Sequence, residues 1–131
     1  MRVVIADDEK FVLVVLKSAL RSVRFPIEIV GEALDGDDAY RLSAAALLDA
    51  ARHERFTLYL LDIMMPGLNG MDAAREIRGF DKAADIIFLT SSPGFAYDSY
   101  SVKALEYLLK PIDEEKLERA ISDVMQRRQM L

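Results

Sequence analysis

A short apolar run that stops at an aspartate limits what this chain can fold into more than any other feature. The run at 58–61 (Leu-Tyr-Leu-Leu) leads into Asp62, and the turn formers Pro66, Gly67 and Gly70 follow. An apolar run without polar alternation is typical of a strand buried on both faces of a parallel sheet. Asp62 is then expected at the carboxyl end of that strand, where open α/β sheets bind ligands. The simpler alternative is that Asp62 only begins a turn.

Four further β-rich runs and five helical patterns surround this strand. The other predicted strands cover 2–6, 27–33, 86–90 and 105–109. Apolar residues at helical spacing, or alanine- and leucine-rich composition, predict helices over 11–23, 39–52, 71–78, 96–102 and from 113 onwards. Gly79 is expected as a C-cap, and the acids at 113–115 favour the start of a helix. The alternation predicts an α/β fold, a doubly wound five-stranded parallel sheet of order 2-1-3-4-5.

The composition suits one compact domain over residues 1–131 and excludes several kinds of site. Apolar residues make up 52% of the chain, which is enough for a core. The net charge of -5 argues against this chain neutralising nucleic-acid phosphates, and the absence of cysteine excludes disulfides and cysteine-ligated zinc. No apolar run approaches the roughly 20 residues that span a bilayer, and no signal-peptide pattern is present. We therefore expect a cytoplasmic protein without a membrane partner.

Polar side chains end four of the five predicted strands. Asp7 and Asp8 follow the first strand. Asp62 ends the third strand, Thr90 ends the fourth and Lys110 follows the fifth. The carboxyl ends of parallel strands lie on one edge, and these four strands are neighbours in the proposed order. Each residue alone has a simpler explanation, such as a helix cap, an ordinary strand residue or a solvated charge. Their occurrence together predicts one site with three carboxylates, a hydroxyl and an ammonium.

The charges of such a site indicate its chemistry. Three neighbouring carboxylates repel one another and raise each other's pKa, and a divalent cation relieves this repulsion. Oxygen ligands suit Mg2+ or Mn2+. Asp62 would then be a nucleophile that forms an acyl phosphate, while Thr90 and Lys110 contact the phosphoryl oxygens.

These residues resemble the receiver domains of two-component response regulators, and the resemblance covers essentially the whole chain. It implies a flavodoxin-like, CheY-like (βα)5 fold in which a sensor histidine kinase phosphorylates Asp62. It also implies that the chain is not an enzyme, although it assists its own phosphorylation and dephosphorylation. The matching motifs are Asp7-Asp8, Asp62 with Met65-Pro66 and Gly70 behind it, Thr90, and Lys110-Pro111.

The resemblance also assigns the protein ligands of the metal ion. Asp8 and Asp62 would bind Mg2+ directly, and Asp7 would bind it mainly through water. The backbone carbonyl of Met64 would complete the protein ligands.

Thr90 and Tyr107 match the switch positions of the family, and Lys110 would sense the phosphoryl group. The alternative for Tyr107 is a half-buried aromatic residue of an edge strand. On phosphorylation, Thr90 would move toward the new acceptor and Tyr107 would rotate inward. The change would reach the surface made by the helix at 96–102, the strand at 105–109 and the last helix. A homodimer or an output partner would use this surface.

The stretch at 97–112 resembles the subgroup of regulators joined to LytTR-type DNA-binding domains. This chain carries no such domain, so it would reach DNA and regulate transcription only through an absent output domain. We expect the chain to be a piece of a longer regulator. The alternative is a stand-alone receiver that acts as a phosphorelay shuttle or as a protein-interaction module.

Other functions fit these residues less well. A phosphatase of the haloacid dehalogenase kind needs a second aspartate two residues after the nucleophile, and Met64 stands there. A degenerate receiver usually lacks a pocket residue, and none is missing. A nucleotide-binding fold needs a glycine-rich loop after the first strand, and no such loop follows the predicted strand at 2–6. Two departures from the receiver pattern lie outside the pocket: Phe56-Thr57 replaces the usual Pro-Asp, and the stretch between 31 and 62 is long.

Overall fold

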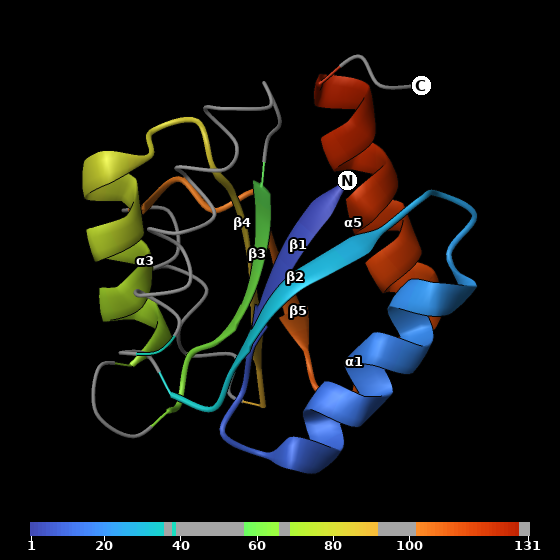
Figure 1. Cartoon of the computed structure of the whole chain (residues 1–131), viewed down its shortest axis with the longest axis horizontal. Coiled ribbons are helices and arrows are strands. Elements are labelled where there is room, and N and C mark those ends of the chain that lie inside the picture. Colours follow the sequence, from blue (N-terminus) through green and yellow to red (C-terminus); the bar gives the residue numbers. More distant parts are fainter. Residues whose placement is uncertain (36–37, 39–56, 66–68, 92–101, 129–131) are drawn as a thin grey trace.

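A five-stranded parallel sheet forms the centre of the molecule (Figure 1). The computed structural model describes residues 1–35, 38, 57–65, 69–91 and 102–128. The strand order β2-β1-β3-β4-β5 confirms the predicted order, and each strand ends within one residue of its predicted ends. The strands are β1 (Arg2–Ala6), β2 (Glu28–Ala33), β3 (Thr57–Asp62), β4 (Asp85–Thr90) and β5 (Glu106–Leu109).

Helices cover both faces of this sheet, as a doubly wound fold requires. In the described part of the chain, α1 (Lys10–Ser22) and α5 (Glu114–Arg127) lie on one face, and α3 (Gly70–Phe80) lies on the other (Figure 1). The helices predicted over 39–52 and 96–102 fall outside the described residues, except for Val102. None of the described helices combines the length and the apolar character that crossing a bilayer would require.

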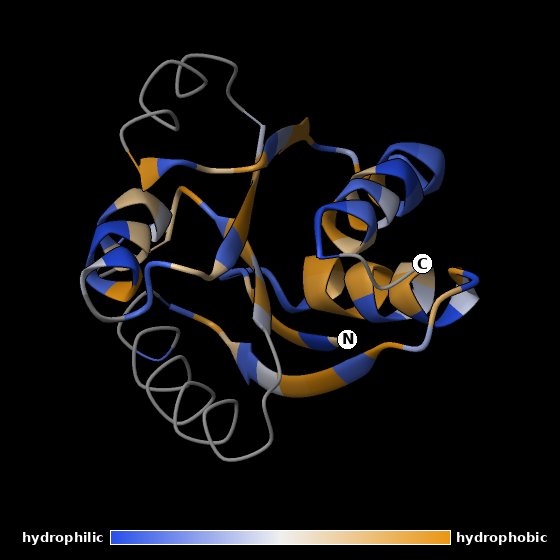
Figure 2. Cartoon of the chain, turned by 90° about the horizontal axis from the view of Figure 1, so that it is seen from above, coloured by the Kyte–Doolittle hydropathy of each residue, from blue (hydrophilic) through white to orange (hydrophobic). Residues whose placement is uncertain are grey.

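Side chains of alternating residues in the central strands pack into two separate hydrophobic cores, one on each face of the sheet. Val3 and Ile5 of β1 pack with apolar side chains of α1 and α5, whereas Val4 and Ala6 pack with those of α3. All residues of β1, β3 and β4 are buried, which explains their unbroken apolar runs. Figure 2 shows hydrophilic residues on the outer side of α5, whereas α1 also carries two exposed hydrophobic residues, Phe11 and Val14. Burying each leucine or isoleucine side chain of the two cores contributes about 1.5–3 kcal/mol to the free energy of folding, relative to leaving it exposed to water.

Side-chain caps explain two helix starts, and one predicted helix end is wrong. Asn69 accepts a hydrogen bond from Asp72 N at 2.9 Å at the start of α3. Asp113 accepts from Glu115 N at 2.9 Å at the start of α5, as the acids at 113–115 predict. Gly79 is not a C-cap, because α3 continues through it to Phe80. The cap is Asp81, whose carboxylate accepts from Ala83 N at 3.2 Å and so stabilises the turn that follows.

Candidate functional site

The carboxyl ends of β1, β3, β4 and β5 bring the predicted residues to one edge of the sheet. Ala6 pairs with Leu61 in the parallel register, so Asp7 and Asp62 follow this pair on adjacent strands. Asp62 pairs with Leu89, so Thr90 is the next residue on the strand beyond. Asp7, Asp62 and Thr90 are all buried.

Lys110 joins β5 to this edge by its backbone and by its side chain. Its backbone N–H donates to Thr90 O at 2.8 Å. Its ammonium Nζ lies 2.6 Å from Asp7 Oδ2 and 3.4 Å from Asp62 Oδ1, so one cation bridges two buried carboxylates. The peptide bond between Lys110 and Pro111 is cis.

Asp7 does not serve as a helix cap. Its Oδ1 accepts from Glu9 N at 2.9 Å, one residue before α1 begins. The N-cap of α1 is Glu9, and its side chain makes no capping hydrogen bond. The second oxygen of Asp7 faces Lys110, so the carboxylate points into the site and the alternative explanation from the sequence fails for this residue.

Asp7, Asp8 and Asp62 can together hold a metal ion. Each offers one carboxylate oxygen, and these atoms all lie within 4.8 Å of one another. Asp8 is exposed, so the group opens to solvent on one side, while Asp7 and Asp62 close it on the other. Three carboxylates face one ammonium, which leaves negative charge for a cation to neutralise. A hard divalent ion such as Mg2+ fits this donor set.

Burial and charge crowding act directly on Asp62. Burial first, and the neighbouring Asp7 second, raise the pKa of Asp62 to about 7, although Lys110 lowers it and Asp8 adds a further increase. For Lys110, burial lowers the pKa, but its contacts with Asp7 and Asp62 outweigh burial and raise it above its ordinary value. The lysine therefore stays charged, while Asp62 is poised between its two protonation states near neutral pH.

The turn after β3 explains why a glycine stands at position 70. A Cβ atom there would lie 1.9 Å from the backbone oxygen of Asp62 and 2.9 Å from the Cα of Ile63. Gly70 N donates to Ile63 O at 2.8 Å, which draws the start of α3 against the end of β3. Met64, the predicted carbonyl ligand, lies in this turn with an exposed side chain. The sequence motif includes Gly70, and the structure explains why a glycine is needed there: a Cβ atom would clash with the backbone at the end of β3.

The predicted switch residues lie on adjacent strands. Thr90 ends β4 with no exposed surface. Tyr107 pairs with Phe88, is half-buried and packs against the core on the α3 side. Beside it, a pocket of about 270 Å3 opens toward α5. Residues lining this pocket are Glu106, Tyr107, Leu108, Lys116, Arg119 and Ala120.

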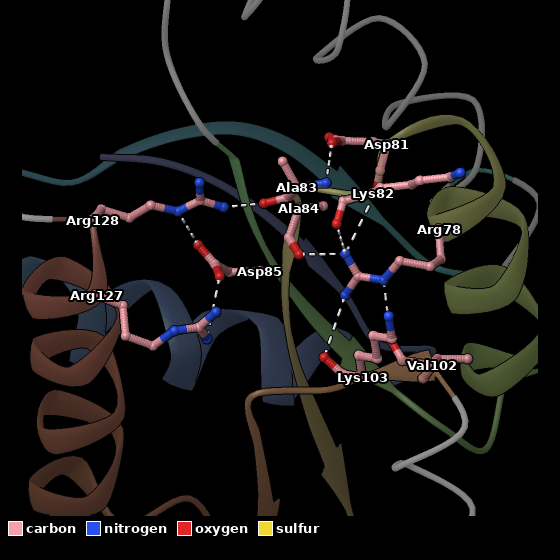
Figure 3. Close-up of polar contacts among 10 residues, drawn as sticks. All are labelled: Arg78, Asp81, Lys82, Ala83, Ala84, Asp85, Val102, Lys103, Arg127 and Arg128. Atoms are coloured by element: carbon pink, nitrogen blue, oxygen red, sulfur yellow. Dashed lines mark hydrogen bonds and ion pairs between the residues drawn. The ribbon is translucent and has the colours of Figure 1, made fainter.

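A second polar cluster, which the sequence does not predict, lies at the opposite edge of the sheet (Figure 3). Asp85 is buried at the first position of β4 and accepts from Arg128 Nε at 3.0 Å. Arg78 of α3 donates to backbone carbonyls on two separate segments. Arg78 and Val102 are 24 residues apart in the sequence, and Asp85 and Arg128 are 43 apart, so no local sequence pattern predicts these contacts.

Comparisons with known proteins agree with this geometry. Protein CcdB of Bacillus subtilis is 32% identical over 126 residues, which are 95% of this chain and 97% of that protein. The sensory transduction protein LytT of Bacillus subtilis is 30% identical over 121 residues, 92% of this chain but 46% of LytT. The chain thus spans about half the length of this relative. A chain of the CheX–CheY–BeF3–Mg2+ complex from Borrelia burgdorferi has a TM-score of 0.76 at 25% identity, covering 95% of this chain and 89% of that one.

The likeness to LytT agrees with the subgroup that the stretch at 97–112 resembles. Residues 3–122 match the family described as the response regulator receiver domain. The chain therefore belongs to the family of response regulator receiver domains.

Proposed function

We propose that this chain works in the cytoplasm as a phosphoacceptor that takes a phosphoryl group on Asp62 from a sensor histidine kinase, with Mg2+ or Mn2+ bound. It would transmit a signal rather than turn over an external substrate as an enzyme does. The observation that carries the proposal is the group of Asp7, Asp8 and Asp62 beside Lys110. A buried nucleophile next to a cation site and an ammonium suits phosphoryl transfer.

The transfer is a substitution at phosphorus. One carboxylate oxygen of Asp62 attacks, an O–P bond forms, and the bond between phosphorus and the donor's imidazole nitrogen breaks. The imidazole leaves with that electron pair and takes up a proton from solvent. A divalent cation, when bound, supplies positive charge against the phosphoryl oxygens and favours ionised Asp62. Asp8 and Asp62 would hold it directly, with Asp7 through water and the Met64 carbonyl as further ligands.

Lys110 and Thr90 would contact the new phosphoryl group. The Lys110 ammonium lies 3.4 Å from Asp62, so it can pass from the carboxylate to a phosphoryl oxygen with a short movement. The Thr90 hydroxyl would move toward the same group, and Tyr107 on the next strand would rotate inward. A surface that includes β5 and α5 would change, and the chain would form a homodimer or meet its output partner there.

The relatives suggest two kinds of output. The chain covers about half of LytT, so in one version it controls transcription through a DNA-binding domain that lies outside this chain. It covers 97% of CcdB, and this observation favours a second version in which the receiver acts alone, as a phosphorelay shuttle or an interaction module.

Acetyl phosphate tests the chemistry without a kinase. We expect the intact mass of the wild-type protein to rise by one phosphoryl group when acetyl phosphate and Mg2+ are present, and not when EDTA replaces Mg2+. Asp62→Asn should gain no mass, and Asp8→Ala should need much more Mg2+ because one ligand is lost. As a matched control, Asp123→Asn removes an exposed carboxylate from α5 and should behave like wild type. Full phosphorylation of Asp62→Asn would refute the assignment.

A further inference from the structure

The guanidinium of Arg78 ties together two segments that lie far apart in the sequence (Figure 3). On one side, Nε donates to Val102 O at 3.0 Å and Nη2 donates to Lys103 O at 3.4 Å. On the other side, Nη1 faces the turn between α3 and β4. It donates there to the carbonyls of Ala84 at 2.6 Å, Lys82 at 3.0 Å and Asp81 at 3.5 Å.

The segment that Arg78 holds leads directly into β5. Val102 is buried in the core on the α3 side. Lys103 has φ 56°, in the left-handed region that L-residues rarely adopt, so the chain turns sharply at this point. Leu105 N then donates to Ile86 O at 2.8 Å, and β5 begins at the next residue. The Arg78 contacts therefore lie at the point where the strand that carries Tyr107 starts.

β5 is thus held at two places, and only one of them belongs to the phosphoacceptor site. At its far end, Lys110 N donates to Thr90 O at 2.8 Å, and the Lys110 side chain contacts Asp7 and Asp62. At its near end, Arg78 fixes Val102 and Lys103 against the turn before β4. A displacement at Thr90 and Lys110 would therefore act on a strand whose start is held by separate contacts.

We propose that Arg78 is a positioning residue for the switch: it fixes the start of β5, so that a change at the phosphoacceptor site rotates Tyr107 instead of shifting the whole strand. This inference rests on the proposed function. Arginine suits the role because its planar fork has donors on two sides, whereas a lysine ammonium is a single point that cannot bridge both segments. Burial of the guanidinium lowers its pKa, and the carbonyls replace the water that it loses.

Two substitutions separate bridging from charge. Arg78→Gln removes the charge and the fork, and Arg78→Lys keeps the charge but not the fork. Arg75→Gln is the matched control, because Arg75 lies one turn earlier on α3 and contacts only the exposed Asp72 among the ion pairs described. Each protein is studied by hydrogen exchange over 102–109, with and without beryllofluoride and Mg2+, and by mass after acetyl phosphate treatment.

We expect all four proteins to be phosphorylated on Asp62. In both Arg78 variants, amide exchange over 102–105 should be at least roughly tenfold faster, because the segment opens more often when the bonds to the Val102 and Lys103 carbonyls are lost. The exchange difference that beryllofluoride causes at Tyr107 should fall several-fold in both, while Arg75→Gln should match wild type.

Two results would overturn the proposal for Arg78, and a third would refute the function on which it rests. Wild-type protection and a wild-type response in Arg78→Lys would show that charge suffices and bridging is unimportant. Loss of the folded state in both Arg78 variants, seen by circular dichroism, would assign Arg78 to stability alone. A wild-type protein that neither gains a phosphoryl group nor responds to beryllofluoride would refute the proposed function itself, which distinguishes that failure from a failure of Arg78.

Discussion

Asp62 carries its charge in an environment that disfavours it. The side chain is almost completely buried, Asp7 lies beside it, and Lys110 at 3.4 Å offsets only part of the cost. Above neutral pH the carboxylate is ionised in spite of this environment, because the pH then exceeds even its raised pKa. The arrangement that suits cation binding therefore costs stability whenever no cation is bound.

This conflict predicts a pH dependence of stability in metal-free protein. The pKa of Asp62 is about 7 in the folded state against an ordinary value of 3.8, so between these values the folded state binds more protons than the unfolded state. The contribution of Asp62 to the free energy of unfolding must then fall as the pH rises from 4 to 7 and change little above that. Asp62→Asn should remove this loss and raise the free energy of unfolding at pH 8 by on the order of 2–4 kcal/mol.

Urea titrations in EDTA at several pH values measure the effect. Asp123→Asn, which removes an exposed carboxylate from α5, should keep the wild-type slope. Adding Mg2+ to the wild-type protein at pH 8 should recover much of the difference, because the ion binds only the folded state. Equal stability of Asp62→Asn and wild type at both pH 4 and pH 8 would contradict the raised pKa.

At the scale of elements, the contact between the end of β3 and the start of α3 sets the shape of the site. Gly70 N donates to Ile63 O, and the missing side chain lets the helix approach the backbone of Asp62. All three nearest atoms to a Cβ at position 70 are backbone atoms, so none can move aside as a flexible side chain would. A larger residue must displace either the strand end or the helix.

Two glycines of the same helix give opposite expectations. Gly70→Ala should destabilise the fold by about 1–3 kcal/mol, because backbone must shift, and should slow phosphorylation by acetyl phosphate. Gly79→Ala meets no atom within 4 Å and should stabilise the fold by about 0.5–1 kcal/mol through helix propensity, with unchanged phosphorylation. Thermal unfolding and the rate of mass gain measure both. If Gly70→Ala had the stability and the phosphorylation rate of the wild-type protein, the close approach of α3 to the backbone of Asp62 would be refuted.

Features predicted from the sequence are those set by local pattern. Strand ends follow from apolar runs that stop at a polar residue, and parallel topology then brings Asp7, Asp62 and Thr90 to one edge. The sequence mispredicts the end of α3, because a glycine at position 79 favours a C-cap there, whereas hydrogen bonds of Asp81 decide the end. The Arg78 contacts with Val102 and Lys103 depend on tertiary packing, which no spacing in the sequence encodes.

At the scale of the whole molecule, the sheet separates two cores that face different helices. The core of α1 and α5 includes Leu108 of β5, whereas Tyr107 packs against the core of α3. β5 is an edge strand, and its Leu109 is 49% exposed. A rotation of Tyr107 therefore changes one core and the outer surface beside α5 together. Charged residues of both signs border this surface, which suits a reversible interface.

We predict that phosphorylation makes this surface self-associate. Sedimentation velocity should show a monomer for the untreated protein and a dimer with beryllofluoride and Mg2+. Arg119 lines the pocket next to Tyr107, so Arg119→Glu should weaken the dimer at least about tenfold, because it reverses a charge on the proposed interface and places a second carboxylate in the pocket that Glu106 lines. Arg75→Glu changes the same charge on α3, across the sheet, and should leave dimerisation intact. If the wild-type protein stays monomeric with beryllofluoride while its mass shows complete phosphorylation by acetyl phosphate, then the surface serves a different partner and the dimer is refuted.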